Sequence, residues 1–274
     1  MGSGTGAGTE IFFAVPGDYP HENTDYHASV GLFHSKFGHV GHFLYLCSMI
    51  DVEICCNSVA SAEAAKAGGA RRIELCRDLE CGGLTPSDGD IAHCVRTLGL
   101  RTHVLVRPRP GDFCYNDAEI IEIEETLMRC RTLGASAVVV GFLTAGGLVD
   151  EPLTRHIVRL AAPMEVTFHR AFDEARQEPL AALAAVARCG CHRLLTSGQA
   201  PSALEGAAVI RRLVEARSGV KILAGGGVTP DNAGRLLALT GVGEVHGSCK
   251  VRLPDGTVQT SPSLVEHLID NTRI

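Results

Sequence analysis

Short hydrophobic segments recur along residues 50–248, and each is followed by a polar turn and then by a segment with helical spacing. The helical segments end at glycine or proline residues that recur every 22 to 35 positions: Gly69, Gly99, Gly134, Pro163, Gly190, Gly219 and Gly241. A parallel βα unit takes roughly 30 residues. The pattern therefore predicts an α/β protein with a single (β/α)8 barrel of the TIM type.

The hydrophobic segments give the bounds of the expected strands. They cover residues 50–55, 72–76, 102–106, 137–141, 165–168, 193–196, 221–224 and 244–246. Ser58 is expected to cap the first helix and Asp117 the long helix that ends at Leu133, since both residue types favour the N-cap position. A last helix over residues 263–270 is expected to close the ring of helices.

The first two expected strands alternate apolar residues with a glutamate and a cysteine. Because side chains alternate between the two faces of a strand, the apolar residues should face the helices. The other set should point into the barrel: Glu53, Cys55, Glu74 and Cys76. Barrel interiors are usually filled with branched apolar side chains, so two inward carboxylates beside two inward thiols indicate a functional site.

The later strands end in polar residues or glycines, which should lie on the same rim of the barrel. These residues are Arg107, Arg109, His169, Arg170, Asp173, Ser197, Gly225, Gly226, Gly227, His246 and Ser248. A buried charge costs several kcal/mol unless it is paired. The carboxylates of Glu53, Glu74 and Asp173 are therefore expected to balance the three arginines, or else a ligand does so. A lattice of salt bridges without any ligand is the structural alternative.

Composition limits the partners and the cellular compartment expected for the protein. The formal net charge of −6 argues against a nucleic-acid partner, because phosphate affinity comes from clustered Lys and Arg. No apolar stretch reaches the ~20 residues of a membrane helix. The 11 cysteines show no zinc-finger or zinc-ribbon spacing. They are expected to be free thiols in a reducing cytoplasm, and most of them to be small buried hydrophobes.

Residues 1–48 differ in composition from the remainder of the chain. Residues 1–50 hold one basic side chain, Lys36, and five of the 12 histidines. We expect residues 1–48 to be a disordered or loosely docked extension and residues 49–274 to form the barrel domain. Two alternatives remain open: translation from Met49, and a histidine-rich tail that collects metal.

Seven motifs in this order resemble the CutC family, which is named for copper homeostasis. They occupy residues 52–55 (VEIC), 72–76 (RIELC), 82–87 (GGLTPS), 107–113 (RPRPGDF), 167–173 (TFHRAFD), 195–198 (LTSG) and 225–227 (GGG). The resemblance implies a barrel, a cytoplasmic location, a homo-oligomer (dimer or tetramer) and a Cu(I) site on Cys55 and Cys76. The chain departs from the family pattern at Asn57, where Asp is usual, at Cys56, and in the tail from Val251.

Two functions are compatible with these residues. The first is copper handling, because Cu(I) is soft and favours thiolate ligands such as Cys55 and Cys76. The second is an enzyme of lyase, aldolase or isomerase type that acts on a small phosphorylated or carboxylated metabolite.

For the enzyme, the acid–base groups would be Glu53, Glu74, His169 and Asp173. Backbone N–H groups after the seventh strand, before the helix that begins near Pro230, would bind an anion. The expected anion-binding residues are Arg107, Arg109, Arg170, Ser197, Gly225, Gly226, Gly227, His246 and Ser248.

Overall fold

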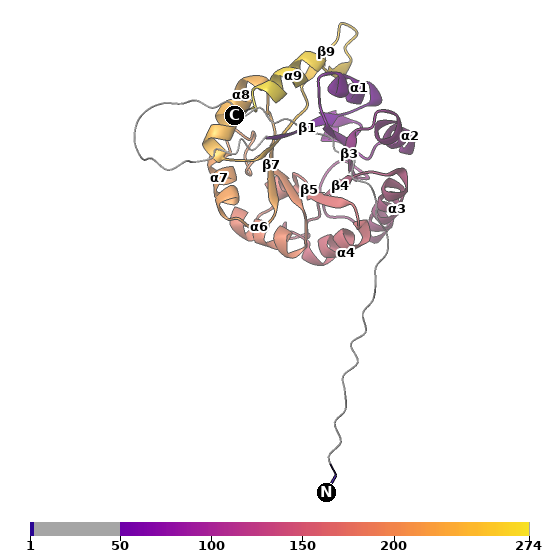
Figure 1. Ribbon diagram of the computed structural model, residues 1–274, viewed down its shortest axis with the longest axis vertical. Coiled ribbons are helices and arrows are strands. Elements are labelled where there is room, and N and C mark those ends of the chain that lie inside the picture. The colour runs from indigo at the N-terminus through magenta and orange to yellow at the C-terminus, as the bar shows by residue number, and fades with distance from the viewer. Residues whose placement is uncertain (3–49, 274) are drawn as a thin grey trace, which may run out of the picture. The chain divides into compact units, whose positions relative to one another are not determined.

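The computed structural model describes residues 1–2 and 50–273, and residues 50–273 contain a closed barrel of eight parallel strands (Figure 1). The strands follow one another around the barrel in chain order, and β1 pairs with β8 to close it. They are β1 (Asp51–Cys56), β2 (Arg72–Leu75), β3 (Arg101–Leu105), β4 (Ala137–Val140), β5 (Glu165–Phe168), β6 (Arg193–Thr196), β7 (Lys221–Gly225) and β8 (Glu244–Gly247). The predicted (β/α)8 barrel is confirmed.

Helices surround the strands on the outside of the barrel (Figure 1). They are α1 (Val59–Ala67), α2 (Asp88–Ala92), α3 (Asp117–Leu133), α4 (Glu151–Ala161), α5 (Ala171–Glu174), α6 (Pro179–Arg188), α7 (Ala207–Glu215), α8 (Pro230–Thr240) and α9 (Pro262–Asp270). Ser58 caps α1 as expected, because its hydroxyl accepts the Ser61 N–H at 3.1 Å.

The expected cap of α3 is wrong by one residue. Asn116 is the N-cap, and its side-chain oxygen accepts the Glu119 N–H at 3.0 Å. The Glu119 carboxylate in turn accepts the Asn116 N–H at 2.8 Å. This reciprocal capping box satisfies two backbone donors. Asp117 is instead the first helical residue, where its negative charge interacts favourably with the positive end of the helix dipole.

Two apolar clusters lie on opposite sides of the barrel wall. The larger one fills the space between strands and helices and includes the fully buried Ile54 and Ile73. The smaller one lies inside the barrel and consists of Cys55, Cys76, Leu105 and Val139. The alternation expected for β1 and β2 is thus confirmed.

A network of charged side chains fills the interior at the amino-terminal ends of the strands. Arg193 is fully buried, and its Nε lies 2.6 Å from Glu244 Oε2. Arg72 joins two carboxylates, because its Nη2 lies 2.8 Å from Glu244 Oε2 and its Nε lies 3.0 Å from Glu53 Oε2. Glu165 adds a contact of 3.2 Å to Arg193. The buried charges of this network are thus paired, as their desolvation requires.

Between β8 and α9 the chain forms a two-stranded antiparallel ribbon that the sequence pattern did not indicate. It consists of β9 (Lys250–Arg252) and β10 (Val258–Thr260). The ribbon packs on α1, where the Thr260 N–H donates to Ser61 Oγ at 3.2 Å. It therefore fixes the segment that follows β8.

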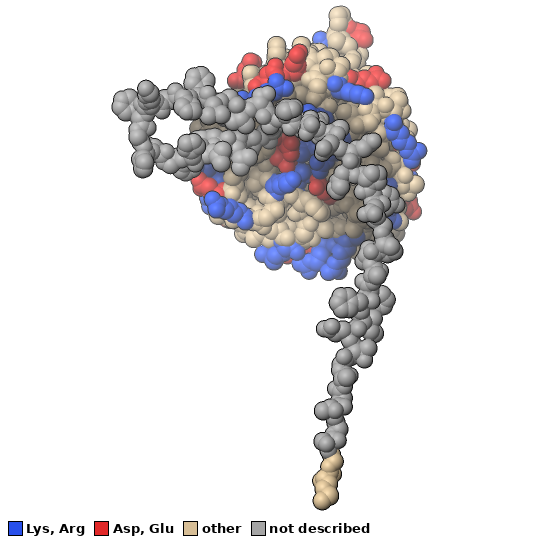
Figure 2. Space-filling model, viewed as in Figure 1, with Lys and Arg blue, Asp and Glu red and all other residues tan. Residues whose placement is uncertain are grey.

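Basic and acidic side chains both appear on the face of the barrel drawn in Figure 2. Among the described residues, none of the helices has the length and apolar character that crossing a bilayer requires. The extension expected over residues 1–48 falls almost wholly outside the described residues, so that expectation stays a prediction.

Candidate functional site

A pocket of about 650 Å³ lies at the carboxyl ends of the barrel strands. Side chains from the ends of β1, β2, β3 and β8 form part of its wall, and the segments after β5 and β7 form much of the remainder. Nine of the residues singled out in the sequence line it: Cys55, Glu74, Arg107, His169, Arg170, Gly226, Gly227, His246 and Ser248. The convergence of strand ends, which the fold dictates, thus brings these residues together.

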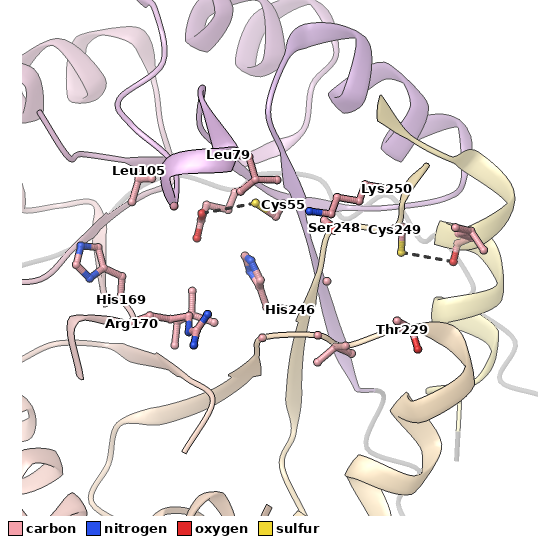
Figure 3. Close-up of a pocket in the computed structure, with 18 of the residues that line it drawn as sticks. Cys55, Leu79, Leu105, His169, Arg170, Thr229, His246, Ser248, Cys249 and Lys250 are labelled. Carbon is pink, nitrogen blue, oxygen red and sulfur yellow. Dashed lines mark hydrogen bonds between the residues drawn. The ribbon is translucent and has the colours of Figure 1, made fainter. Parts of the chain in front are cut away.

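Cysteine, glutamate and histidine side chains meet on one side of the pocket. Cys55 Sγ lies 3.9 Å from Cys76 Sγ and 3.9 Å from Glu74 Oε1. Ligand atoms of Cys55, Glu74 and His246 all lie within 4.8 Å of one another. In Figure 3 the imidazole of His246 points toward Cys55. Cys76 is buried next to Cys55 and does not line the pocket.

Glu53 orients the His246 ring from below the pocket. Its Oε1 lies 3.0 Å from His246 Nδ1, which leaves Nε2 as the ring nitrogen available to a ligand. The other carboxylate oxygen is held by Arg72 and lies 2.7 Å from His103 Nδ1. A carboxylate behind the second nitrogen of a histidine is the usual support of a metal-binding imidazole.

Burial and neighbouring charges set the protonation of this cluster. The hydrogen bond to Cys76 and burial hold the pKa of the Cys55 thiol well above its usual value. Burial acts to lower the pKa of His246, but the charge of Glu74 and contacts with Cys55 and Glu53 raise it well above 6.5. Burial raises the pKa of Glu74 to about 7. Binding of a cation here would therefore displace protons.

Glu53 behaves differently from Glu74 although both are buried. Burial acts to raise the pKa of Glu53, but attraction to His103 and hydrogen bonds to His103 and His246 hold it well below its usual value. Glu53 is consequently a permanent anion that belongs to the charged interior, whereas Glu74 faces the pocket.

His169 lies at the end of β5 on another part of the pocket wall. Its Nδ1 accepts the Ala171 N–H at 3.1 Å, and the Phe113 ring packs against it with 4.8 Å between centroids. Burial, together with the positive charge of Arg107, lowers the pKa of His169 to about 3. The imidazole is therefore neutral at physiological pH.

The two arginines of the pocket are held in different ways. Arg107 is buried and donates to the carbonyl oxygens of Cys81, Gly83 and Gly111 at 3.0, 3.1 and 2.8 Å. Arg170 keeps 46% of its side chain exposed, while its Nε and Nη2 donate to Asp173 Oδ2 at 2.7 Å and Ser197 Oγ at 3.0 Å.

The glycine segment after β7 requires its residue type. Gly226 and Gly227 have φ angles of +102° and +73°, a region that side chains disfavour. A Cβ at Gly226 would also stand 3.0 Å from Ser197 Cβ. Both glycines line the pocket next to Thr229, the residue that precedes α8.

Six of the expected site residues do not line the pocket: Glu53, Cys76, Arg109, Asp173, Ser197 and Gly225. Arg107 and Arg109 were both expected to pair with a rim carboxylate, and this is wrong for both. The Arg107 guanidinium is held by carbonyl oxygens. Arg109 is held by carboxylates outside the pocket, because its guanidinium pairs with Glu119 at 2.5 Å and with Asp112 at 3.0 Å. Asp173 does pair with Arg170, but its carboxylate also accepts backbone N–H groups of Ser197 and Gln199, so it fixes a loop.

Two further residues of the site were missed in the sequence. His103 is fully buried in β3 against Glu53, and the alternation along residues 101–105 would have placed it inside. Lys250 also lines the pocket. Its position depends on the ribbon after β8, which has no clear signal in the sequence.

Comparison with known proteins identifies relatives of the barrel. The sequence model described as the CutC family matches residues 50–251. A CutC family protein of Chromobacterium violaceum is 48% identical over 200 residues, which cover 73% of this chain and 81% of that protein. The Homo sapiens protein named copper homeostasis protein cutC homolog is 41% identical over 200 residues, 73% of each chain.

Solved structures agree with this match. The crystal structure of CutC from Streptococcus agalactiae has a TM-score of 0.69 at 31% identity and covers 73% of this chain and 99% of that one. Thiamine phosphate pyrophosphorylase from Pyrococcus furiosus has a TM-score of 0.54 at 16% identity and covers 83% and 97% of the two chains. At that identity the likeness shows the barrel fold alone.

Fold and site define the class of protein: a (β/α)8 barrel with a buried thiol pair and a histidine at the carboxyl ends of its strands. The family match spans most of the barrel, and the Chromobacterium violaceum and Homo sapiens relatives are both more than 40% identical to this chain. The chain belongs to the CutC family.

Proposed function

We propose that this protein binds Cu(I) as its cargo in copper homeostasis, through the thiolates of Cys55 and Cys76 with His246 as a third ligand. The names of its relatives support the copper assignment. The observation that carries it is the pair of buried sulfur atoms 3.9 Å apart, with the His246 imidazole beside Cys55.

The donor set fits the ion chemically. Thiolates are soft ligands that select Cu(I), and imidazole also suits copper. The sulfur separation of 3.9 Å is far longer than a disulfide bond of about 2.05 Å, so both thiols are free to act as ligands. The carboxylate of Glu74 is a harder donor and is expected to lie beside the ion rather than to hold it.

The proposal includes the cellular compartment and the oligomeric state of the protein. We assign it to the cytoplasm, where a reducing environment keeps thiols free, and all cysteines among residues 50–273 are unpaired with one another. A homo-oligomer, dimer or tetramer, follows from the family resemblance and is checked by light scattering of the purified chain.

The enzyme alternative has fewer available groups than the sequence suggested. Of its four acid–base candidates, Glu74 and His169 line the pocket, whereas Glu53 and Asp173 do not. Glu53 is held by Arg72 and His246, and Asp173 by a loop. This distribution supports copper binding as the better-founded function.

The test is a competitive titration of the full-length chain with Cu(I) and a chromogenic chelator, without oxygen and with a reductant. We expect one tightly held Cu(I) in the wild type and its loss in the double variant Cys55→Ser/Cys76→Ser. The matched control is Cys94→Ser/Cys130→Ser, which removes two fully buried thiols of the outer core. Equal affinity in wild type and the first variant would contradict the proposal.

Supporting residues give a graded response in the same titration. His246→Gln removes the third ligand, and Glu53→Gln removes the carboxylate behind it. Loss of such an outer partner typically lowers metal affinity 10- to 100-fold. We expect both variants to bind more weakly than wild type and more tightly than the double cysteine variant.

A further inference from the structure

The imidazole of His169 is a buried polar group on the pocket wall that has no role in the copper site. Its exposed fraction is 5%, and its Nε2 has no hydrogen-bond partner among the described residues. A buried polar atom without a hydrogen-bond partner destabilises the folded protein. A polar atom on a pocket wall that has no partner in the protein is available to a molecule that enters the pocket.

The hydrogen bond on the other nitrogen fixes the tautomer. Nδ1 accepts the Ala171 N–H at 3.1 Å, so Nδ1 carries no proton. A neutral imidazole has one N–H, and a pKa of about 3 keeps this ring neutral. The proton therefore lies on Nε2. His169 presents a hydrogen-bond donor, and not an acceptor, to whatever occupies the pocket.

Close packing and the Ala171 hydrogen bond hold the His169 ring. A Cβ at Gly141, which follows β4, would stand 2.3 Å from both Cε1 and Nδ1 of His169. The glycine thus makes room for the imidazole, and the Phe113 ring packs against it. A donor held in this way loses little entropy when a ligand binds, and such preorganisation strengthens binding.

Positive charge lies on the same side of the pocket. Arg107 lines the pocket, and its positive charge helps to lower the pKa of His169. Arg170 uses its Nε and Nη2 for Asp173 and Ser197, while its Nη1 lies toward Gly226, at 3.6 Å from the position of an added Cβ. Figure 3 shows His169 and Arg170 near each other and apart from Ser248 and Lys250. A neutral donor beside two cations favours an oxygen that carries negative charge.

We propose that His169 Nε2–H and Arg170 form an oxyanion subsite that binds a carboxylate, carbonyl or phosphate oxygen of a small organic anion. The pocket has the volume for one, since about 650 Å³ lies in the range of small-molecule sites and far exceeds the need of a single metal ion. The subsite does not depend on the copper proposal, because neither of its residues is among the copper ligands.

The first test measures the tautomer directly. Nitrogen-15 NMR of histidine-labelled, metal-free protein at pH 7 reports which ring nitrogen of His169 is protonated, with His169→Gln used to assign the signal. We expect Nε2–H. A ring protonated on Nδ1, or on both nitrogens, would overturn the proposal, because the pocket would then lack the inferred donor or contain a cation instead.

The second test measures binding to the metal-free full-length chain by calorimetry. The probes are pyruvate, 2-phosphoglycolate and inorganic phosphate, so that carboxylate and phosphate recognition are distinguished. His169→Leu removes the donor and should weaken binding roughly 10- to 100-fold, as expected for a hydrogen bond to a charged group. His169→Gln keeps an N–H donor and should bind better than His169→Leu. His156→Leu, at an exposed histidine of α4, is the control.

The outcomes separate this subsite from the copper site. The Cys55→Ser/Cys76→Ser protein should still bind the anionic probe, and His169→Leu should still bind Cu(I). Absence of binding for all three probes, or unchanged affinity in His169→Leu, would overturn the subsite while leaving copper binding intact. Failure of copper binding with retained, His169-dependent anion binding would instead overturn the copper proposal alone.

Discussion

The buried neutral His169 makes the stability of the barrel depend on pH in a specific window. Burial and the charge of Arg107 lower its pKa in the folded state to about 3, from 6.5 for an ordinary histidine. Between these two values the unfolded chain binds a proton that the folded protein does not bind. The free energy of unfolding therefore rises with pH through this window and falls as the solution is acidified below about 6.5.

The magnitude follows from the two pKa values. Each unit of separation corresponds to about 1.4 kcal/mol. At pH 5, about 1.5 units below the unfolded-state value and well above the folded-state value, the loss relative to pH 7 is about 2 kcal/mol. That is a large part of the stability of about 5–15 kcal/mol that is typical of a folded domain.

Urea unfolding followed by circular dichroism at pH 7 and pH 5 measures this loss. The comparison is between wild type and His169→Gln, in metal-free reducing buffer. Other groups titrate in the same range: burial raises the pKa of Glu74 to about 7, which stabilises the folded protein as the pH falls. Glu74 is present in both proteins, so its contribution cancels in the difference.

We expect wild type to lose about 2 kcal/mol more than His169→Gln between pH 7 and pH 5. A control variant at an exposed histidine of α9, His267→Gln, should lose as much as wild type. If wild type and His169→Gln differ by less than about 0.5 kcal/mol, then the imidazole is not held neutral by burial. The tautomer inferred for the pocket would fail with it.

Two further predictions test the fold. Arg193→Met should destabilise the barrel by about 3–5 kcal/mol in urea unfolding, because it removes a partner of the buried Glu244 carboxylate; a loss below about 1 kcal/mol would show that Arg72 alone suffices. Asn116→Ala should destabilise it by about 1 kcal/mol through loss of the α3 cap, and an unchanged midpoint of unfolding would contradict the capping role.

The sequence was informative where a side chain's direction follows from local periodicity. Alternation in β1 and β2 placed the two cysteines and two glutamates inside the barrel, and the structure confirms it. The rim residues could be grouped because parallel strands in a barrel end on the same side. The direction of the side chains and the grouping of the rim residues could both be predicted without knowing the contacts between strands and loops.

The ion-pair partners of the arginines were harder to predict from the sequence, because they depend on loop paths and on the stagger between strands. Arg109 pairs with Glu119, which lies on α3 beyond the loop. Arg72 and Arg193 both reach Glu244, although β2, β6 and β8 are far apart in the chain. The ribbon of β9 and β10 could not be predicted, because three-residue strands show no clear hydrophobic period.

Glu53 connects the charged interior with the proposed copper site. One of its carboxylate oxygens contacts Arg72 and His103, and the other contacts Nδ1 of His246. Because Arg72 also reaches Glu244, the orientation of the His246 ring depends on a network that extends to the amino-terminal ends of the strands. The charges that fill the barrel in place of branched apolar side chains therefore have a second consequence: they fix the imidazole that faces Cys55 before any ion arrives.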